Sequence, residues 1–192
     1  MIQLRKIKSY DIEEDEYKKI INKSLCDYIN KYCGDKRFAL ILDSTHERTG
    51  KMLFDNGFIC VVSPELDKSK LDKKYSIALE MDYDYVANIF VNTGIKHSFI
   101  FPDYENMSTP SIIKSKITEK LLSIANPEGT LIAFTASQRC GRGRKHRRCI
   151  GHLKSHVSRV GKKMGMFTKF LSNISSKGIR KKRGGPMDTI IF

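Results

Sequence analysis

Four short runs of consecutive apolar residues mark the first 137 residues of the chain, and each run ends in polar or acidic residues. Continuous rather than alternating hydrophobicity is typical of strands that are covered on both faces, as in a parallel sheet. We therefore predict one central strand in each run. The runs are RFALILD (37–43), FICVVSPE (58–65), HSFIFPDYEN (97–106) and GTLIAFTAS (129–137).

Helical periodicity marks the segments around these runs. Between 14 and 33, apolar residues recur at helical spacing, acids crowd the first turn, and Gly34 is placed to end the helix. A shorter helix is predicted at 46–57. Thr109 is predicted to cap a further helix that has Pro110 at its first position. The buried stripe of that helix is expected to contain Ile113, Ile117, Leu121 and Ile124.

Three other segments have weaker patterns. Residues 75–91 indicate a short strand and a loop, and residues 152–172 indicate a lightly hydrophobic helix. The final stretch, 177–192, predicts a hairpin with its turn at Gly184-Gly185 and a closing strand MDTIIF. Three hydrophobic residues are expected to pack the 152–172 helix on the sheet: Phe167, Phe170 and Leu171.

Strands that alternate with helices predict βαβ units and an α/β fold. We expect a mostly parallel, Rossmann-like sheet with helices on both faces and an antiparallel hairpin at its end. We expect one domain over 1–192, with an N-terminal helical region at 1–36 and a basic loop and helix at 137–165 within it. Ligands of such open sheets bind outside the carboxyl ends of the strands.

The charge of the chain is concentrated in its last third. Residues 129–192 contain sixteen Lys and Arg and a single acid, Asp188, whereas residues 1–128 contain nineteen bases and twenty acids. A segment with almost no net charge followed by a strongly positive segment indicates a protein that binds a polyanion through one part of its surface. Nucleic acid is the favoured partner; an anionic membrane, another acidic partner and a basic segment that only aids solubility are the alternatives.

The densest cationic cluster directly follows the fourth predicted strand, on the ligand side of the sheet. The arginine guanidinium binds phosphate through two hydrogen bonds and stacks on bases, so a cluster of this composition favours nucleic-acid binding, with RNA favoured over DNA. The cluster is also compatible with a nuclear-localisation signal. A second patch precedes the Gly184-Gly185 turn. The candidate nucleic-acid residues are Arg139, Arg142, Arg144, Lys145, Arg147 and Arg148 in the first patch and Lys181, Lys182 and Arg183 in the second.

Cysteine and histidine usage bears on redox state and metal binding. Five scattered cysteines favour reduced thiols in an intracellular compartment, cytoplasmic or nuclear. The start of the chain has no secretory signal, and no apolar run approaches the ~20 residues that span a bilayer. Two thiols and three imidazoles could make a zinc site, but their spacing is not that of a zinc finger, and histidines in a basic nucleic-acid-contacting loop are preferred. We assign no metal site to this group, which comprises Cys140, His146, Cys149, His152 and His156.

Successive motifs at the strand ends resemble those of class I S-adenosylmethionine-dependent methyltransferases. They are LILDSTHERTGKMLFDNGF, VVSPELD, FIFPDYENM and LIAFTASQR, which together cover roughly residues 37–139. The resemblance is to a poorly characterised group of large DNA viruses and microbial eukaryotes. It implies the class I methyltransferase fold, whose parallel strands are followed by a terminal antiparallel hairpin.

The resemblance also implies where S-adenosylmethionine would bind. In the family, a Gly-x-Gly loop after the first strand lets the backbone approach the cofactor, but here the only glycine of the loop after Asp43 comes late, at Gly50. The hydroxyls of Ser44 and Thr45 would take over some contacts. Glu65, or Asp67 just beyond it, falls where the family's second-strand acid accepts hydrogen bonds from the ribose diol. The implied cofactor residues are Asp43, Ser44, Thr45 and Glu65.

The implied catalytic residues lie in PDYEN (102–106), where amino-methylating members carry an Asp/Asn-Pro-Pro-aromatic motif. Asp103 could accept a proton or a hydrogen bond from a target nitrogen, and Tyr104 could stack on a base. The order of residues differs from the family motif, and Asp103 could instead cap the turn before the helix at Thr109.

Three hypotheses follow from these observations. The first is a methyltransferase that acts on a nucleic acid, RNA favoured, or on a ribonucleoprotein. The second is an inactive methyltransferase-fold protein that binds nucleic acid or serves as an interaction module. The third is a small interaction protein whose basic end docks on an acidic partner. The sequence does not indicate the acceptor atom or the oligomeric state.

Overall fold

A single seven-stranded sheet organises the protein. The computed structural model describes residues 9–43, 47–68, 71–102, 109–114, 116–137, 144–175 and 187–192. The strands lie in the order β3-β2-β1-β4-β5-β7-β6. They are β1 (Phe38–Ile41), β2 (Cys60–Pro64), β3 (Ile77–Leu79), β4 (Phe99–Phe101), β5 (Leu131–Ser137), β6 (Ser172–Ser175) and β7 (Met187–Ile191).

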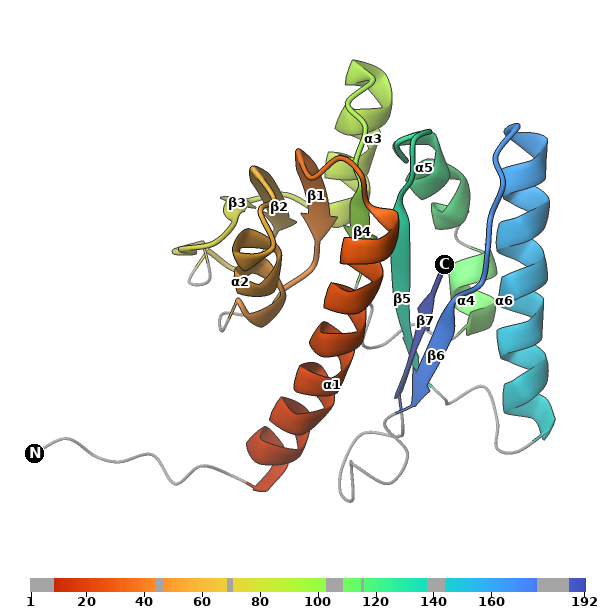
Figure 1. The fold of residues 1–192 in the computed structure, drawn as a ribbon, viewed down its shortest axis with the longest axis horizontal. Helices are drawn as coiled ribbons and strands as arrows, with labels where there is room; N and C mark the ends of the chain where they lie inside the picture. Colours follow the sequence, from red (N-terminus) through yellow and green to blue (C-terminus); the bar gives the residue numbers. More distant parts are fainter. Residues whose placement is uncertain are drawn as a thin grey trace, which may run out of the picture.

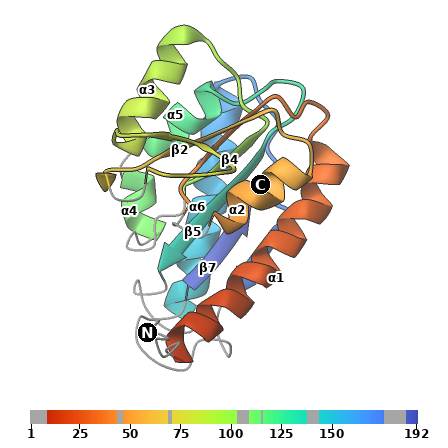
Figure 2. The same ribbon diagram turned by 90° about the vertical axis from the view of Figure 1, so that its left-hand side faces the viewer.

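Helices cover both faces of this sheet, with α1 and α2 on one side and α3 to α6 on the other (Figures 1 and 2). β1 to β5 are mutually parallel, and β7 runs antiparallel to both β5 and β6. The predicted fold class is therefore confirmed. The helices are α1 (Ser9–Tyr32), α2 (Arg48–Asp55), α3 (Tyr83–Thr93), α4 (Thr109–Lys114), α5 (Ile117–Ser123) and α6 (Arg144–Lys163).

The continuous apolar runs are explained by this two-sided covering. Along β1, Ala39 and Ile41 face the core beneath α1 and α2, whereas Leu40 faces the core beneath α3 to α6. In the parallel neighbour β4, Ile100 pairs with Leu40 and points to the same side. All of these side chains are fully buried. Since neither face of the strands meets water, neither face needs polar residues.

The closing strand and its terminal antiparallel pairing were predicted correctly, and the strand that precedes β7 in this pair is β6. β7 lies between β5 and β6, with Thr189 paired to Thr135 on one side and to Ile174 on the other. Its observed antiparallel neighbours are thus 131–137 and 172–175. The predicted turn at Gly184-Gly185 lies outside the described residues.

Two helical predictions are corrected. The segment predicted as a strand and a loop at 75–91 contains β3 and then α3, which Asp82 caps by accepting a hydrogen bond from the Asp84 amide and which ends at Gly94 in the left-handed conformation. The single helix expected after Thr109 is two, α4 and α5. Lys116, with φ of 56°, directly precedes α5 and cannot continue a right-handed helix.

A buried histidine precedes β4. His97 has no exposed surface and lies between the rings of Phe90 and Phe38, at centroid distances of 4.4 and 6.1 Å. Among the described residues, neither of its ring nitrogens has a hydrogen-bond partner of good geometry. Burial lowers the pKa of His97 from 6.5 to about 4, against a smaller opposing effect of the Ile124 and Ile95 backbones.

This histidine predicts acid sensitivity. Between pH 6.5 and about 4 the unfolded chain binds a proton at His97 that the folded protein does not, so stability is complete above pH 6.5 and is lost as pH falls through this window. The expected loss from this group is on the order of 3 kcal/mol. Urea titrations at several pH values should show it, and His97→Leu should flatten the profile there. An equally steep fall in that variant would contradict the assignment.

The described cysteines are unpaired thiols: Cys26, Cys33, Cys60 and Cys149. Burial raises the pKa of the Cys33 thiol to about 11, so this thiol stays protonated at neutral pH. Within the described residues, no helix has the length and apolar character to cross a bilayer.

Candidate functional site

The strand order places a reversal point beside β1. The chain proceeds from β1 to β2 and β3 on one side and crosses to β4 and β5 on the other. Open α/β sheets bind ligands at the carboxyl ends of the strands next to such a reversal. The backbone N–H of Leu42 continues the β1–β4 pairing by donating to the Phe101 carbonyl at 2.9 Å. Asp43 follows directly, so its position at this edge is fixed by the sheet.

Asp43 also supports the helix that follows it. Its Oδ2 accepts a hydrogen bond from the Gly50 amide at 2.7 Å, within the first turn of α2. Amides of a first helical turn have no intrahelical partner, and a carboxylate there is favoured by the helix dipole. The side chain is partly buried. Asp43 is therefore a structural residue as well as a candidate ligand residue.

Glu47 was not singled out from the sequence, and its carboxylate accepts three hydrogen bonds at this edge. It is only 6% exposed and adopts a left-handed backbone, with φ of 45°, immediately before α2. Its carboxylate accepts hydrogen bonds from the amides of Lys74 and Tyr75 and from Ser76 Oγ. These bonds hold segment 71–76 against the start of α2.

Lys73 lies in the same segment, and its ammonium bridges the ends of β1 and β2. Its Nζ donates to the Asp43 carbonyl oxygen at 3.1 Å and to the Ser63 hydroxyl at 2.7 Å. Ser63 has no exposed surface. The edge therefore presents a cation beside its acids, which the sequence pattern did not indicate.

Glu65 comes directly after β2, and its amide donates to the Leu79 carbonyl at the end of β3. Its Oε1 accepts a hydrogen bond from the Asp67 amide at 3.0 Å, and its side chain is half-buried. Asp43 and Glu65 therefore lie at the carboxyl ends of paired neighbouring strands, as predicted. Two carboxylates and an ammonium can together bind a ligand that carries donors and an anionic group.

The side chains of the other predicted site residues lie outside the part of the chain that the structure describes. The positions of Arg144, Lys145, Arg147 and Arg148 form the start of α6, which begins seven residues after β5 ends, but their side chains are outside the description. The remaining candidates lie wholly outside the described residues. They are Ser44, Thr45, Asp103, Tyr104, Arg139, Arg142, Lys181, Lys182 and Arg183.

The three histidines predicted to lie in a basic loop, His146, His152 and His156, all fall within α6. His152 is exposed on α6, whereas His156 is 7% exposed and its Nδ1 lies 3.3 Å from Arg159 Nη2. Burial, opposed by Glu119 and assisted by Arg159, lowers the pKa of His156. Among the described residues, no three potential metal ligands come together.

S-adenosylmethionine-dependent methyltransferases share this fold. A proposed enzyme of this kind from Streptococcus mutans has a TM-score of 0.62 at 11% identity, over 88% of this chain and 48% of that one. One from Agrobacterium tumefaciens has a TM-score of 0.61 at 9% identity, over 91% and 61%. Magnesium protoporphyrin IX methyltransferase from Synechocystis, with S-adenosylmethionine bound, has a TM-score of 0.59 at 6% identity, over 97% and 84%.

Identities this low establish a shared fold and carry no information about substrate. The protein therefore has the class I methyltransferase fold, and it spans about half the length of the Streptococcus relative. No protein-family model matches the sequence, and a search of curated proteins found no match.

Proposed function

We propose that the protein is an S-adenosylmethionine-dependent methyltransferase that acts on a nucleic acid or on a ribonucleoprotein, with RNA favoured over DNA as the nucleic acid. The observation that carries this proposal is the pair of acids, Asp43 and Glu65, at the carboxyl ends of β1 and β2 beside the reversal point of the sheet. Structural neighbours include enzymes crystallised with S-adenosylmethionine or S-adenosylhomocysteine.

The described residues fit the functional groups of this cofactor. Glu65 is a half-buried carboxylate that suits a ribose diol, and Lys73 offers an ammonium to the methionine carboxylate. Asp43 would supply negative charge for the cationic amino group and sulfonium of the cofactor. The cofactor supplies an electrophilic methyl group, and the protein's task is to align the acceptor in line with it.

The proposed substrate class rests on charge. Residues 129–187 contain no acid, and α6 begins close after β5, whose carboxyl end belongs to the proposed ligand edge. A substrate rich in phosphate would be held beside the cofactor by this distribution. Asp103 and Tyr104 remain the proposed acceptor-contacting residues, and assignment to the group of large DNA viruses and microbial eukaryotes rests on sequence resemblance.

A second candidate function is a catalytically inactive, nucleic-acid-binding protein on the same fold. The observation that favours it is the pair of hydrogen bonds from Lys73 to Asp43 and Ser63. Through them, a side chain of the protein already occupies groups that a cofactor could use. The absence of a Gly-x-Gly loop points in the same direction.

Calorimetric titration with S-adenosylmethionine distinguishes the active methyltransferase from the inactive nucleic-acid-binding protein. Asp43→Asn keeps an oxygen that can accept the Gly50 hydrogen bond and removes only the charge, and Glu65→Gln removes the second carboxylate. Each is expected to weaken binding by about ten-fold or more, the effect of losing one hydrogen bond to a charged group. Glu128→Gln, on the loop before β5 and so at the opposite edge, is the matched control and should bind like the wild type.

Lys73→Ala is expected to change the affinity for S-adenosylmethionine in opposite directions under the two proposed functions. If Lys73 holds the cofactor carboxylate, the variant binds less tightly; if Lys73 blocks the site, the variant gains binding heat. Binding by the wild type that neither acid substitution changes would overturn the proposed site. Absence of binding to the wild type and to Lys73→Ala would overturn the enzymatic function and leave the binding protein.

A further inference from the structure

Phe167 does not pack on the sheet as predicted. α6 ends at Lys163, Gly165 adopts a left-handed backbone with φ of 72°, and the ring of Phe167 is 91% exposed. The other two members of the predicted set follow α6 rather than belonging to it: Phe170 is partly buried against the core beneath α3 to α6, and Leu171 against the core beneath α1 and α2. Exposing a phenylalanine forgoes about 1.5–3 kcal/mol of burial, so this ring is available to a partner.

The backbone that carries Phe167 is held rigidly. A Cβ at Gly161 would lie 2.4 Å from Thr168 Cγ2, so the segment after α6 folds back in direct contact with the helix. The Met166 amide donates to the Gly161 carbonyl at 2.8 Å, and the Leu171 amide donates to the Ile191 carbonyl at 2.9 Å. Bonds on both sides of Phe167 therefore present the ring to solvent without a large ordering cost on binding.

Exposed basic residues lie on both sides of Phe167 in the sequence. Lys162, Lys163 and Lys169 are exposed, and Arg159 is exposed one turn earlier on α6. α6 contains no acid over its 20 residues. The helix is ~30 Å long and runs from the carboxyl edge of β5 toward the opposite edge of the sheet, where its exposed cations Arg159, Lys162 and Lys163 lie near its end (Figure 1).

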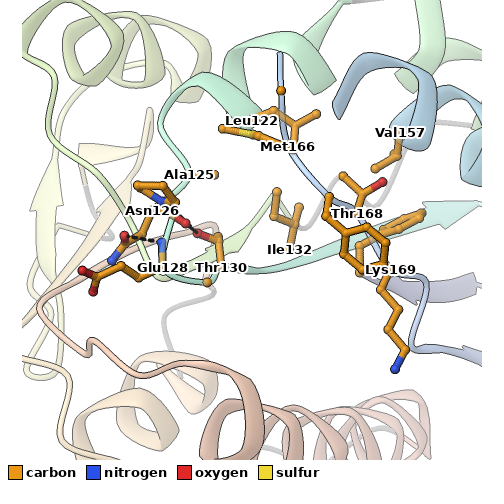
Figure 3. Close-up of a pocket in the computed structure, with 15 residues that line it drawn as sticks. Leu122, Ala125, Asn126, Glu128, Thr130, Ile132, Val157, Met166, Thr168 and Lys169 are labelled. Carbon is orange, nitrogen blue, oxygen red and sulfur yellow. Dashed lines mark hydrogen bonds between the residues drawn. The ribbon is translucent and has the colours of Figure 1, made fainter. Parts of the chain in front are cut away.

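A cavity of about 380 Å³ adjoins Phe167 at that opposite edge. Ile132 lies at its centre in Figure 3, with Asn126, Glu128 and Thr130 on one side and Thr168 and Lys169 on the other. Glu128 is the acid among the lining residues and can accept hydrogen bonds from an amino group. The apolar part of the lining comes from Leu122, Ala125, Ile132, Val157, Met166 and Phe192.

We propose that Phe167 and this cavity bind a base of a single-stranded nucleic acid whose phosphates follow the exposed cations of α6. An exposed aromatic ring stacks on any base, the cations neutralise phosphates, and the cavity provides an apolar site with polar groups at its rim. This surface lies at the edge opposite the proposed cofactor site. The inference rests on the nucleic-acid part of the proposed function and assigns it a second, base-contacting region.

Fluorescence anisotropy with labelled oligouridylate of ~12 nucleotides, titrated at several salt concentrations, tests the proposal. Phe167→Ala should weaken binding about five-fold or more, as expected for loss of one stacked base, and leave the salt slope unchanged. Phe167→Trp should retain wild-type affinity. Replacing Lys162 and Lys163 by Gln should instead reduce the salt slope by about 1.4, at ~0.7 for each lost phosphate contact.

Tyr85→Ala is the matched control, because Tyr85 is 59% exposed on α3 with Asp82 and Asp84 as neighbours in the sequence. Its affinity should equal that of the wild type. Wild-type binding that Phe167→Ala leaves unchanged overturns this inference alone and leaves the proposed function standing. A wild type that does not bind the oligonucleotide overturns both the nucleic-acid part of the proposed function and this surface.

Discussion

Replacing Arg142, Arg144, Arg147 and Arg148 by glutamine is expected to flatten the slope of log affinity for nucleic acid against log salt by about three to four units. Each arginine that neutralises a phosphate releases condensed counterions, at ~0.7–0.9 for each contact. Glutamine removes the charge and is as good a helix former as arginine, so α6 should persist. We expect each substitution to change stability by less than ~0.5 kcal/mol, the usual effect of a surface substitution. Binding isotherms at four or more salt concentrations give the slope directly.

The matched control removes four positive charges from the balanced part of the chain. Lys23, Lys31, Lys36 and Lys96 all precede residue 129 and can be replaced by glutamine together. That variant has the same net charge as the arginine variant, so it separates an effect of total charge from an effect of location. If both variants shift the slope equally, or if the arginine variant keeps the wild-type slope and affinity, the cluster is not the nucleic-acid surface.

Glu47→Ala is expected to lower the free energy of unfolding by about 3 kcal/mol. The buried carboxylate accepts hydrogen bonds from two amides and a hydroxyl of segment 71–76, and its removal leaves these donors without their charged acceptor. Urea denaturation measures the loss. Limited proteolysis should show increased cleavage within 71–76, because this segment loses its attachment to α2.

Two further variants test whether hydrogen bonding is the cause. Glu47→Gln keeps one acceptor oxygen and should lose less than Glu47→Ala. Glu80→Ala removes an acid from an exposed ion pair with Lys68 and should cost less than ~1 kcal/mol. The interpretation is wrong if Glu47→Ala is no more destabilising than Glu80→Ala.

Most of the sheet could be predicted because its strands are buried on both faces. A run such as FALI admits no polar residue when Leu40 faces one core and Ile41 the other, so the sequence alone marks the strand. β6 is different: its sequence, SNIS, is half-buried at the edge of the sheet, and only pairing with β7 makes it a strand. A pairing set by a distant segment leaves no periodic signal.

The candidate site was predictable only where strand geometry fixes it. Asp43 and Glu65 follow paired parallel strands, so their common edge follows from topology. The contacts of Lys73 with Asp43 and of Glu47 with Tyr75 join positions 28–30 residues apart through an irregular segment. Phe167 was expected to be buried because the predicted helix was extended to 172, past the left-handed Gly165 at which the chain leaves α6.

The place of β7 has a consequence for the order of folding during synthesis. Residues 187–191 are inserted between β5 and β6, and Ile190 and Ile191 are fully buried, one in each core. While the ribosome is still making residues before 187, β5 has an open edge and β6 has no partner, so the parallel half of the sheet can form but both cores stay incomplete. The nascent chain therefore exposes the unpaired edge of β5 while its most cationic segment is already synthesised. A chaperone or nucleic acid that covers this edge would act on the protein before its fold is closed.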